Sequence, residues 1–238
     1  MYGFDQTLNG FGPGKNQLIF EAMKNRLFLI LILFGSFFTH SWSQGIPFEG
    51  EVRQISAKYD SLGWIPGGTV FTGSSTIRMW NTLEETFLNE NLINTGFGGS
   101  KASDLERHLF PLVIKFEPSR VFIYEGDNDL WADVPVADIL QSLDNIATRI
   151  HLINPETQIF LIGAKPSPSR WEKKENYLIF NKLLAEYCKA KEKVEFVDVW
   201  KALTKEDGSP RPELYIQDQL HLNAEGYKIW AGVFKEFF

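Results

Sequence analysis

The stretch Phe71–Trp80, FTGSSTIRMW, runs from an apolar approach through Gly73 and two serines into a helix-forming segment. The residues leading into it, GTVFTG at 68–73, are mostly β-branched or aromatic and end in glycine, which is typical of a buried strand. Small polar residues at such a strand-to-helix turn are usually structural. The same turn can also present a side chain at the end of a strand. Two hypotheses follow: an ordinary turn, or a nucleophilic Ser75.

The pattern of a short apolar run followed by a longer amphipathic segment repeats along the chain. Further strands are predicted at NLINTG (91–96), RVFIYEG (120–126), TQIFLIGA (157–164) and VEFVDV (194–199). Helices are predicted over 76–89, 101–116, 135–153, 173–191 and 223–237. Strands that alternate with helices indicate a parallel sheet covered on both faces. About five parallel strands fit an α/β fold of the doubly wound, flavodoxin-like kind.

Composition narrows the classes of function. The 238 residues are 44% hydrophobic, which suits a globular domain with a full core. The formal net charge is -6 and there is no basic stripe, so nucleic acid is not an expected partner. A single cysteine, Cys188, excludes an intramolecular disulfide framework and a cysteine-rich metal site. The histidines lack metal-ligand spacing, so neither a metal nor another cofactor is expected.

The N-terminal residues predict export. From Met23, the basic Lys24 and Arg26 precede a short apolar run and then small polar residues, the order of a secretory signal. We therefore expect a signal peptide over 23–43, an upstream tail over 1–22 that a misassigned start would explain, and the functional domain over 44–238. The mature protein would be secreted or periplasmic, without stable membrane insertion. An uncleaved anchor is the alternative, although spanning a bilayer needs about 20 apolar residues.

Polar and small residues gather where the predicted strands end, the edge at which ligands bind in such folds. Ser75 follows the first strand, Gly99 the second and Asn128 the third; Asp218 and His221 come just before the last helix. A serine hydroxyl becomes a nucleophile when a base takes its proton, and His221 is the candidate base. Asp218, three residues earlier, could fix the histidine tautomer. This is the logic of a serine triad.

The same edge offers donors for the oxyanion that acyl transfer creates. These are the backbone N–H of Ser75 at a helix N-terminus, the backbone N–H of Gly99 and the side-chain amide of Asn128. Each feature also has an ordinary explanation, since glycines mark loops and Asn and Asp cap turns and helices. The joint pattern at one sheet edge is what favours a catalytic site.

Four blocks of the chain together resemble the SGNH hydrolases, the GDSL-type lipase and acylhydrolase superfamily. They are FTGSSTIRMW, INTGFGGSKASDL, IYEGDNDL and DQLHLNAEGY, and they extend from about 70 to 228. The first block departs from the family, because Ser74 stands where the family has aspartate. The resemblance implies a three-layer α/β/α sandwich and metal-free ester hydrolysis through an acyl-enzyme. It also implies the site residues: catalytic Ser75, His221 and Asp218, with Ser75, Gly99 and Asn128 forming the oxyanion hole.

Other nucleophiles and other classes are weaker. Ser74 matches the family aspartate, and Ser100 in GGSKA lacks the last glycine of a G-x-S-x-G elbow. GFGGS follows a predicted strand, but neither nucleotide-binding glycine motif is present. A non-catalytic carbohydrate-binding module on the same fold is a further alternative, although the chemistry-bearing residues are retained.

The substrate is the least determined point. Short loops without an apolar lid favour a short acyl group, acetyl foremost, and export makes an acetylated carbohydrate reachable. A lysophospholipase, or a lipid esterase similar to the platelet-activating-factor acetylhydrolases, is the alternative. In KPSPSRW, Trp171 could stack on a sugar and Arg170 could hold a carboxylate or phosphate at the mouth of the site. A solvated arginine and an anchoring tryptophan are the ordinary reading of that pair.

Overall fold

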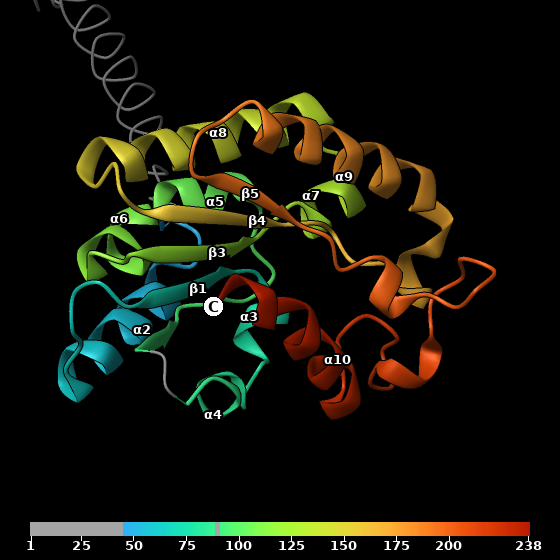
Figure 1. Ribbon diagram of the computed structural model, residues 1–238, viewed down its shortest axis with the longest axis horizontal. Coiled ribbons are helices and arrows are strands. Elements are labelled where there is room, and N and C mark those ends of the chain that lie inside the picture. The colour runs from blue at the N-terminus through green and yellow to red at the C-terminus, as the bar shows by residue number, and fades with distance from the viewer. Residues whose placement is uncertain (1–44, 89–90) are drawn as a thin grey trace, which may run out of the picture. The chain divides into compact units, whose positions relative to one another are not determined.

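A computed structural model describes residues 45–88 and 91–238 (Figure 1). Every structural statement below concerns these residues. The compact unit that contains the sheet runs from Ile46 to Phe238. The predicted tail over 1–22 and the predicted signal peptide over 23–43 lie outside the described residues, so they stay predictions, as does the start of the domain at 44.

Five parallel strands form one sheet in the order β2-β1-β3-β4-β5. The strands are β1 (Thr69–Gly73), β2 (Leu92–Asn94), β3 (Arg120–Tyr124), β4 (Gln158–Ile162) and β5 (Val194–Val197). The chain first adds β2 on one side of β1 and then adds the remaining strands on the other side. In open α/β sheets, ligands bind beyond the carboxyl ends of the strands at the point where the order reverses, which here lies between β1 and β3. The expected flavodoxin-like fold is confirmed.

Helices cover both faces of the sheet and make three layers (Figure 1). One core includes side chains of α2 (Glu49–Leu62), α5 (Ala102–Arg107), α6 (Leu109–Leu112), α8 (Val136–Ile153) and α9 (Lys174–Lys189). The opposite core includes side chains of α3 (Ser75–Arg78), α4 (Leu83–Thr86) and α10 (Ala224–Phe234). Successive side chains of β3 alternate between these cores, as the period of a strand requires. Among the described helices, none combines the length and apolarity needed to cross a membrane.

Stacked phenylalanines fix α10 against the sheet. Phe71, Phe122 and Phe160 are register partners on adjacent strands, and their rings stack at 4.3 and 4.5 Å between centroids. Phe234 of α10 meets the edge of this row at 5.5 Å. Aromatic pairs of this kind contribute about 0.5–1.5 kcal/mol each beyond their area burial. His221, the predicted catalytic base, comes just before α10 in the sequence. By holding α10 on the sheet, this packing keeps His221 near the carboxyl end of β1.

The helices depart from the sequence predictions in three places. The helix predicted over 101–116 is interrupted, with α5 and α6 separated at His108 and a 3-10 turn at Ile114–Phe116. Pro111 explains the break, because it lacks an N–H and its ring clashes with the carbonyl four residues earlier. The second departure concerns the single helix predicted over 76–89. The structure has two short helices in this segment, α3 and α4. Between them the chain turns and buries Trp80 against the aromatic side chains of α10. Helix α2 was not predicted.

Candidate active site

The turn after β1 presents Ser75 as the first residue of α3. Gly73 has φ +120°, and a Cβ there would collide with the backbone carbonyl of Tyr124 on β3. Only glycine therefore allows β1 to end so close to β3 while the chain turns into α3. The Ser75 hydroxyl consequently lies at the carboxyl edge of the sheet, with the helix N–H groups beside it.

A chain of short contacts joins Ser75 to a histidine and a carboxylate. Ser75 Oγ lies 2.8 Å from His221 Nε2, and His221 Nδ1 lies 2.6 Å from Asp218 Oδ2. The other carboxylate oxygen of Asp218 accepts the backbone N–H groups of Leu220 and His221, at 2.8 and 2.9 Å. Partial burial raises the pKa of Asp218, but these hydrogen bonds outweigh it and hold the pKa below its usual value. An ionised Asp218 that accepts from Nδ1 leaves the Nε2 lone pair facing the serine hydroxyl.

Two contacts hold the histidine loop in register with the serine. The hydroxyl of Tyr227 on α10 donates to the carbonyl of Thr76 at 2.8 Å, which ties α10 to α3. The backbone N–H of Ile216 donates to the carbonyl of His221 at 2.9 Å. The first contact ties α10 to the helix that carries Ser75, and the second closes the loop that carries His221.

The loop after β2 brings Gly99 to the same edge. Gly99 has φ +58°, and a Cβ there would meet no atom within 4 Å. The preceding Gly98 N–H donates to both carboxylate oxygens of Glu51 on α2, at 3.1 Å each. Glu51 also accepts from Arg78 of α3 at 3.3 Å. One side chain of α2 thus braces both the loop of Gly99 and the helix of Ser75.

Asn128 lies in α7 (Asp127–Trp131), the short helix after β3. Its Nδ2 donates to the carbonyl of Ser100 at 2.9 Å, and its Oδ1 accepts from Arg170 at 2.9 Å. The structure thus places the three predicted oxyanion donors on neighbouring strand ends. Their catalytic roles, like those of Ser75, His221 and Asp218, stay predictions.

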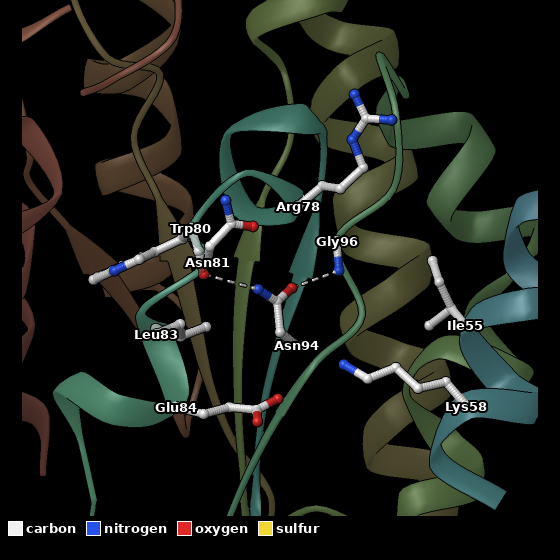
Figure 2. Close-up of a pocket in the computed structure, with 9 residues that line it drawn as sticks. All are labelled: Ile55, Lys58, Arg78, Trp80, Asn81, Leu83, Glu84, Asn94 and Gly96. Atoms are coloured by element: carbon white, nitrogen blue, oxygen red, sulfur yellow. Dashed lines mark hydrogen bonds between the residues drawn. The ribbon is translucent and has the colours of Figure 1, made fainter. Parts of the chain in front are cut away.

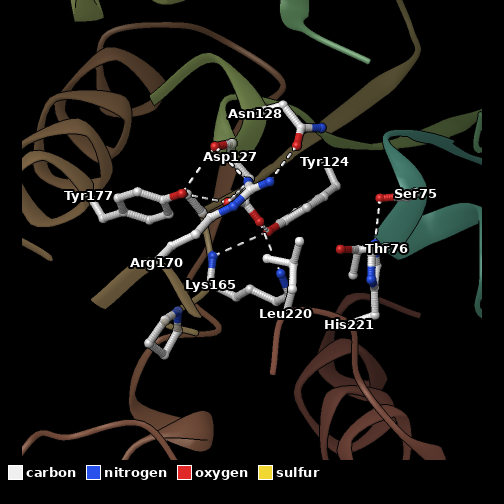
Figure 3. A network of polar contacts seen from close by, with 12 residues as sticks. Ser75, Thr76, Tyr124, Asp127, Asn128, Lys165, Arg170, Tyr177, Leu220 and His221 are labelled. Carbon is white, nitrogen blue, oxygen red and sulfur yellow. Dashed lines mark hydrogen bonds and ion pairs between the residues drawn. The ribbon is translucent and has the colours of Figure 1, made fainter. Parts of the chain in front are cut away.

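Asp127, beside Asn128, is the centre of a buried polar network (Figure 3). Four side chains donate to its carboxylate: Tyr124 (2.7 Å), Tyr177 (2.6 Å), Lys165 (2.9 Å) and Arg170 (2.7 Å). Burial alone would raise the pKa of Asp127, but Lys165 and Arg170 hold it well below its usual range. The carboxylate is therefore ionised although its side chain is 4% exposed.

Two more acids follow β3, and burial raises the pKa of both. Burial raises the pKa of Glu125 well above its usual range. One of its oxygens accepts from Ser100 Oγ at 2.7 Å, and the other is buried without a protein partner. Burial therefore favours the protonated form of Glu125. Burial also raises the pKa of Asp129, to about 6, although its carboxylate accepts the N–H of Ala102.

The structure locates the two predicted substrate-binding residues without testing that role. Arg170 is engaged with Asp127 and Asn128, and its side chain is 10% exposed. Trp171 stacks on Trp200, with 6.0 Å between ring centroids, and Lys174 lies over it.

Sequence reasoning missed Tyr124, Asp127, Lys165 and Tyr177. Two signals were present: Asp127 is a charged residue inside the Gly-x-Asn-Asp block, and Lys165 comes directly after the apolar strand predicted over 157–164.

A pocket of about 270 Å³ lies beside α3 and the loop after β2 (Figure 2). Its lining mixes charged, amide and apolar side chains: Ile55, Lys58, Arg78, Trp80, Asn81, Leu83, Glu84 and Asn94, with the backbone of Gly96. Asn94 shapes one wall, because its Oδ1 accepts the Gly96 N–H at 3.0 Å. Within 45–88 and 91–238, no group of three or more His, Cys, Asp or Glu is placed to hold a metal ion.

Comparison with known proteins finds one matching family model and several solved structures with a similar fold. A model of the GDSL-like lipase/acylhydrolase family matches residues 60–229. A protein of Streptococcus pneumoniae described as a platelet activating factor is 25% identical, with a TM-score of 0.71 over 91% of this chain and 98% of its own. A GDSL-like lipase of Bacteroides thetaiotaomicron is 19% identical, with a TM-score of 0.68 over 78% and 96%. A catalytic mutant of an acetylxylan esterase from Geobacillus stearothermophilus is 15% identical, with a TM-score of 0.60 over 72% and 94%. The search of curated proteins found no match.

Proposed function

Because this chain belongs to the GDSL-like lipase/acylhydrolase family and is a carboxylic ester hydrolase, we propose that Ser75 is its nucleophile and that it removes short acyl groups, acetyl foremost, from carbohydrate outside the cell. The observation that carries the nucleophile is the pair of contacts at His221, 2.8 Å to Ser75 Oγ and 2.6 Å to Asp218 Oδ2. Nucleophile, base and orienting group are thus within hydrogen-bond reach of one another.

The proposed first step forms an acyl-enzyme. Ser75 Oγ attacks the ester carbonyl while His221 Nε2 takes the hydroxyl proton, and Asp218 stabilises the imidazolium. The backbone N–H groups of Ser75 and Gly99 and the Asn128 amide receive the oxyanion of the tetrahedral intermediate. His221 then returns the proton to the leaving alcohol. Water, activated by the same histidine, releases the acyl group as a carboxylic acid and frees Ser75.

Three features support a small acyl group on a carbohydrate outside the cell. The loops between the motif blocks are short, and a signal peptide is predicted over 23–43. An acetylxylan esterase shares the fold, so this architecture accommodates an acetylated polysaccharide in at least one protein.

A lipid ester with a short acyl group is the second candidate. It is favoured by the similarity to the Streptococcus pneumoniae protein described as a platelet activating factor, the one structural relative above that reaches 25% identity. Both candidates share the short acyl group and differ in the alcohol that leaves.

The test compares the protein starting at Gln44 with its Ser75→Ala variant on p-nitrophenyl acetate, butyrate and octanoate. We expect the acetate to be cleaved fastest, and Ser75→Ala to lower kcat by at least ~10³-fold. Faster cleavage of octanoate would contradict the short-acyl proposal. Acetylated xylan and acetylated sugars, set beside an acetylated lysophospholipid, then decide between the two carriers. Polysaccharide binding without turnover in either protein would favour the non-catalytic module.

A further inference from the structure

An arginine and a lysine from the segment after β4 converge on Asp127, the residue before Asn128 (Figure 3). Arg170 belongs to the 3-10 helix Pro168–Lys173, and Lys165 lies in the loop before it. Both reach the carboxylate of Asp127, and their side chains are 10% and 0% exposed. Burying charged groups costs free energy even when they are paired. The triad chemistry uses neither cation, so their burial here calls for a separate reason.

The Asn128 amide is held in one orientation by contacts at both of its ends. Arg170 Nη2 donates to Asn128 Oδ1, and Asn128 Nδ2 donates to the carbonyl of Ser100, each at 2.9 Å. A guanidinium only donates and a carbonyl only accepts, so a flipped amide would lose both hydrogen bonds. Nδ2 carries a second N–H, and this hydrogen remains for the oxyanion.

Arg170 is itself fixed in place. Its Nη1 donates to Asp127 Oδ1 at 2.7 Å and to the Asp127 carbonyl at 3.0 Å, while its guanidinium lies over the ring of Trp131 at 5.5 Å. The second oxygen of Asp127 accepts from Lys165 at 2.9 Å and from Tyr124 at 2.7 Å. The guanidinium therefore has little freedom to leave the amide.

The network also sets the electrostatics behind the amide. A charge-assisted hydrogen bond at the carbonyl end draws electron density from the nitrogen, which makes the remaining N–H a stronger donor. Lys165 and Arg170 bring two positive charges against the one negative charge of Asp127, so these three side chains together carry a net positive charge behind the amide. A positive cluster behind the donor favours the negative charge that develops in front of it.

We propose that Arg170, backed by Asp127 and Lys165, is a positioning residue for ester hydrolysis that fixes and polarises the Asn128 amide as an oxyanion donor. This inference rests on the proposed function, in which Asn128 is such a donor. It gives Arg170 a role different from the substrate binding predicted from the sequence, since Arg170 acts through Asn128.

A double-mutant cycle on p-nitrophenyl acetate tests the coupling, with Arg170→Met, Asn128→Ala and both together. We expect Asn128→Ala to lower kcat by ~10²–10³-fold, as loss of one oxyanion donor does. Arg170→Met should lower kcat about 10–100-fold, with KM within about twofold, because only the intermediate feels the change. The double variant should stay within about threefold of Asn128→Ala. The proposal would be overturned if the losses of kcat in the two single variants multiply in the double variant. It would also be overturned if Arg170→Met raises KM and leaves kcat unchanged.

A rescue experiment covers the case in which Arg170→Met folds poorly. Guanidinium ion at millimolar concentration should restore turnover to Arg170→Ala but not to Asn128→Ala. Failure to rescue a folded Arg170→Ala protein would overturn the proposal. The matched control is Arg149→Met, because Arg149 on α8 donates to the carbonyl of Glu106 and should leave kcat unchanged. Activity that survives Ser75→Ala would instead refute the proposed function.

Discussion

Asp218 and Asp127 are two carboxylates at the same edge of the sheet, yet they are built in opposite ways. The Asp218 side chain is 43% exposed, and its partners lie two and three residues away in the same loop. The Asp127 side chain is 4% exposed, and its two cationic partners lie 38 and 43 residues away. Asp218, the proposed partner of the catalytic histidine, is held near solvent by residues of its own loop. Asp127 is buried and is held by residues that are distant in the sequence. Loss of each should therefore appear in a different measurement.

The largest effect is expected from Asp218→Asn on turnover. The asparagine amide would donate to His221 Nδ1, which moves the ring proton to Nε2, where it blocks acceptance of the serine proton. We expect kcat to fall by about 10⁴-fold, as in serine triads generally. The melting temperature should change little, because the side chain is partly exposed. A variant that keeps a tenth of the wild-type kcat would refute the role of Asp218.

The same substitution at Asp127 should act most strongly on folding, besides lowering turnover through Arg170. Asp127→Asn leaves Lys165 and Arg170 without their counter-charge in a buried place. Removing one partner of a buried ion pair typically costs about 3–5 kcal/mol. We expect a loss of this size in the free energy of unfolding by urea. Equal losses of stability in Asp127→Asn and Asp218→Asn would break the comparison between the two carboxylates.

A third acid, Asp129, should show how burial of a carboxylate makes the stability of the protein depend on pH. Burial raises its folded pKa to about 6, above the unfolded value of about 3.9, so the folded state binds more protons between these values. Its contribution to stability therefore grows as pH falls from 7 to 4. We expect the wild type to gain about 2 kcal/mol relative to Asp129→Asn over this range. Urea unfolding of both proteins at several pH values measures the difference, and parallel stability profiles would contradict it.

The smallest effect is expected at Glu125. Burial raises the pKa of its carboxyl and favours the protonated form, which glutamine matches in charge and nearly in shape. The contact from Ser100 Oγ to the retained oxygen survives. We expect Glu125→Gln to change the free energy of unfolding by less than about 1 kcal/mol. Thermal unfolding near neutral pH measures this, with Glu125→Ala as a control that leaves Ser100 unpaired. A loss like that of Asp127→Asn would mean that Glu125 is ionised.

The sequence predicted the features that depend on local pattern. Each strand is a short apolar run, so all five were located within about two residues, and the strand-end rule brought Ser75, Gly99 and Asn128 to one edge. Helix α2 escaped notice because only Val52 and Tyr59 of its fourteen residues are buried, which leaves a sparse apolar stripe.

The network around Asp127 could not be predicted in this way. Its donors come from β3, from the loop after β4 and from α9, and no local pattern links them. A lysine in a loop is ordinarily solvated, so its position after an apolar strand was not enough to predict that Lys165 is completely buried.

The brace from Glu51 has a practical consequence for handling the enzyme. Because α2 holds the loop of Gly99 and the helix of Ser75 through one carboxylate, we expect a tag or surface linkage that pulls on the start of α2 to distort the proposed active site. Immobilisation through Lys182, which is 76% exposed on α9, would leave that brace untouched. On a solid support, the point of attachment should therefore decide how much activity survives.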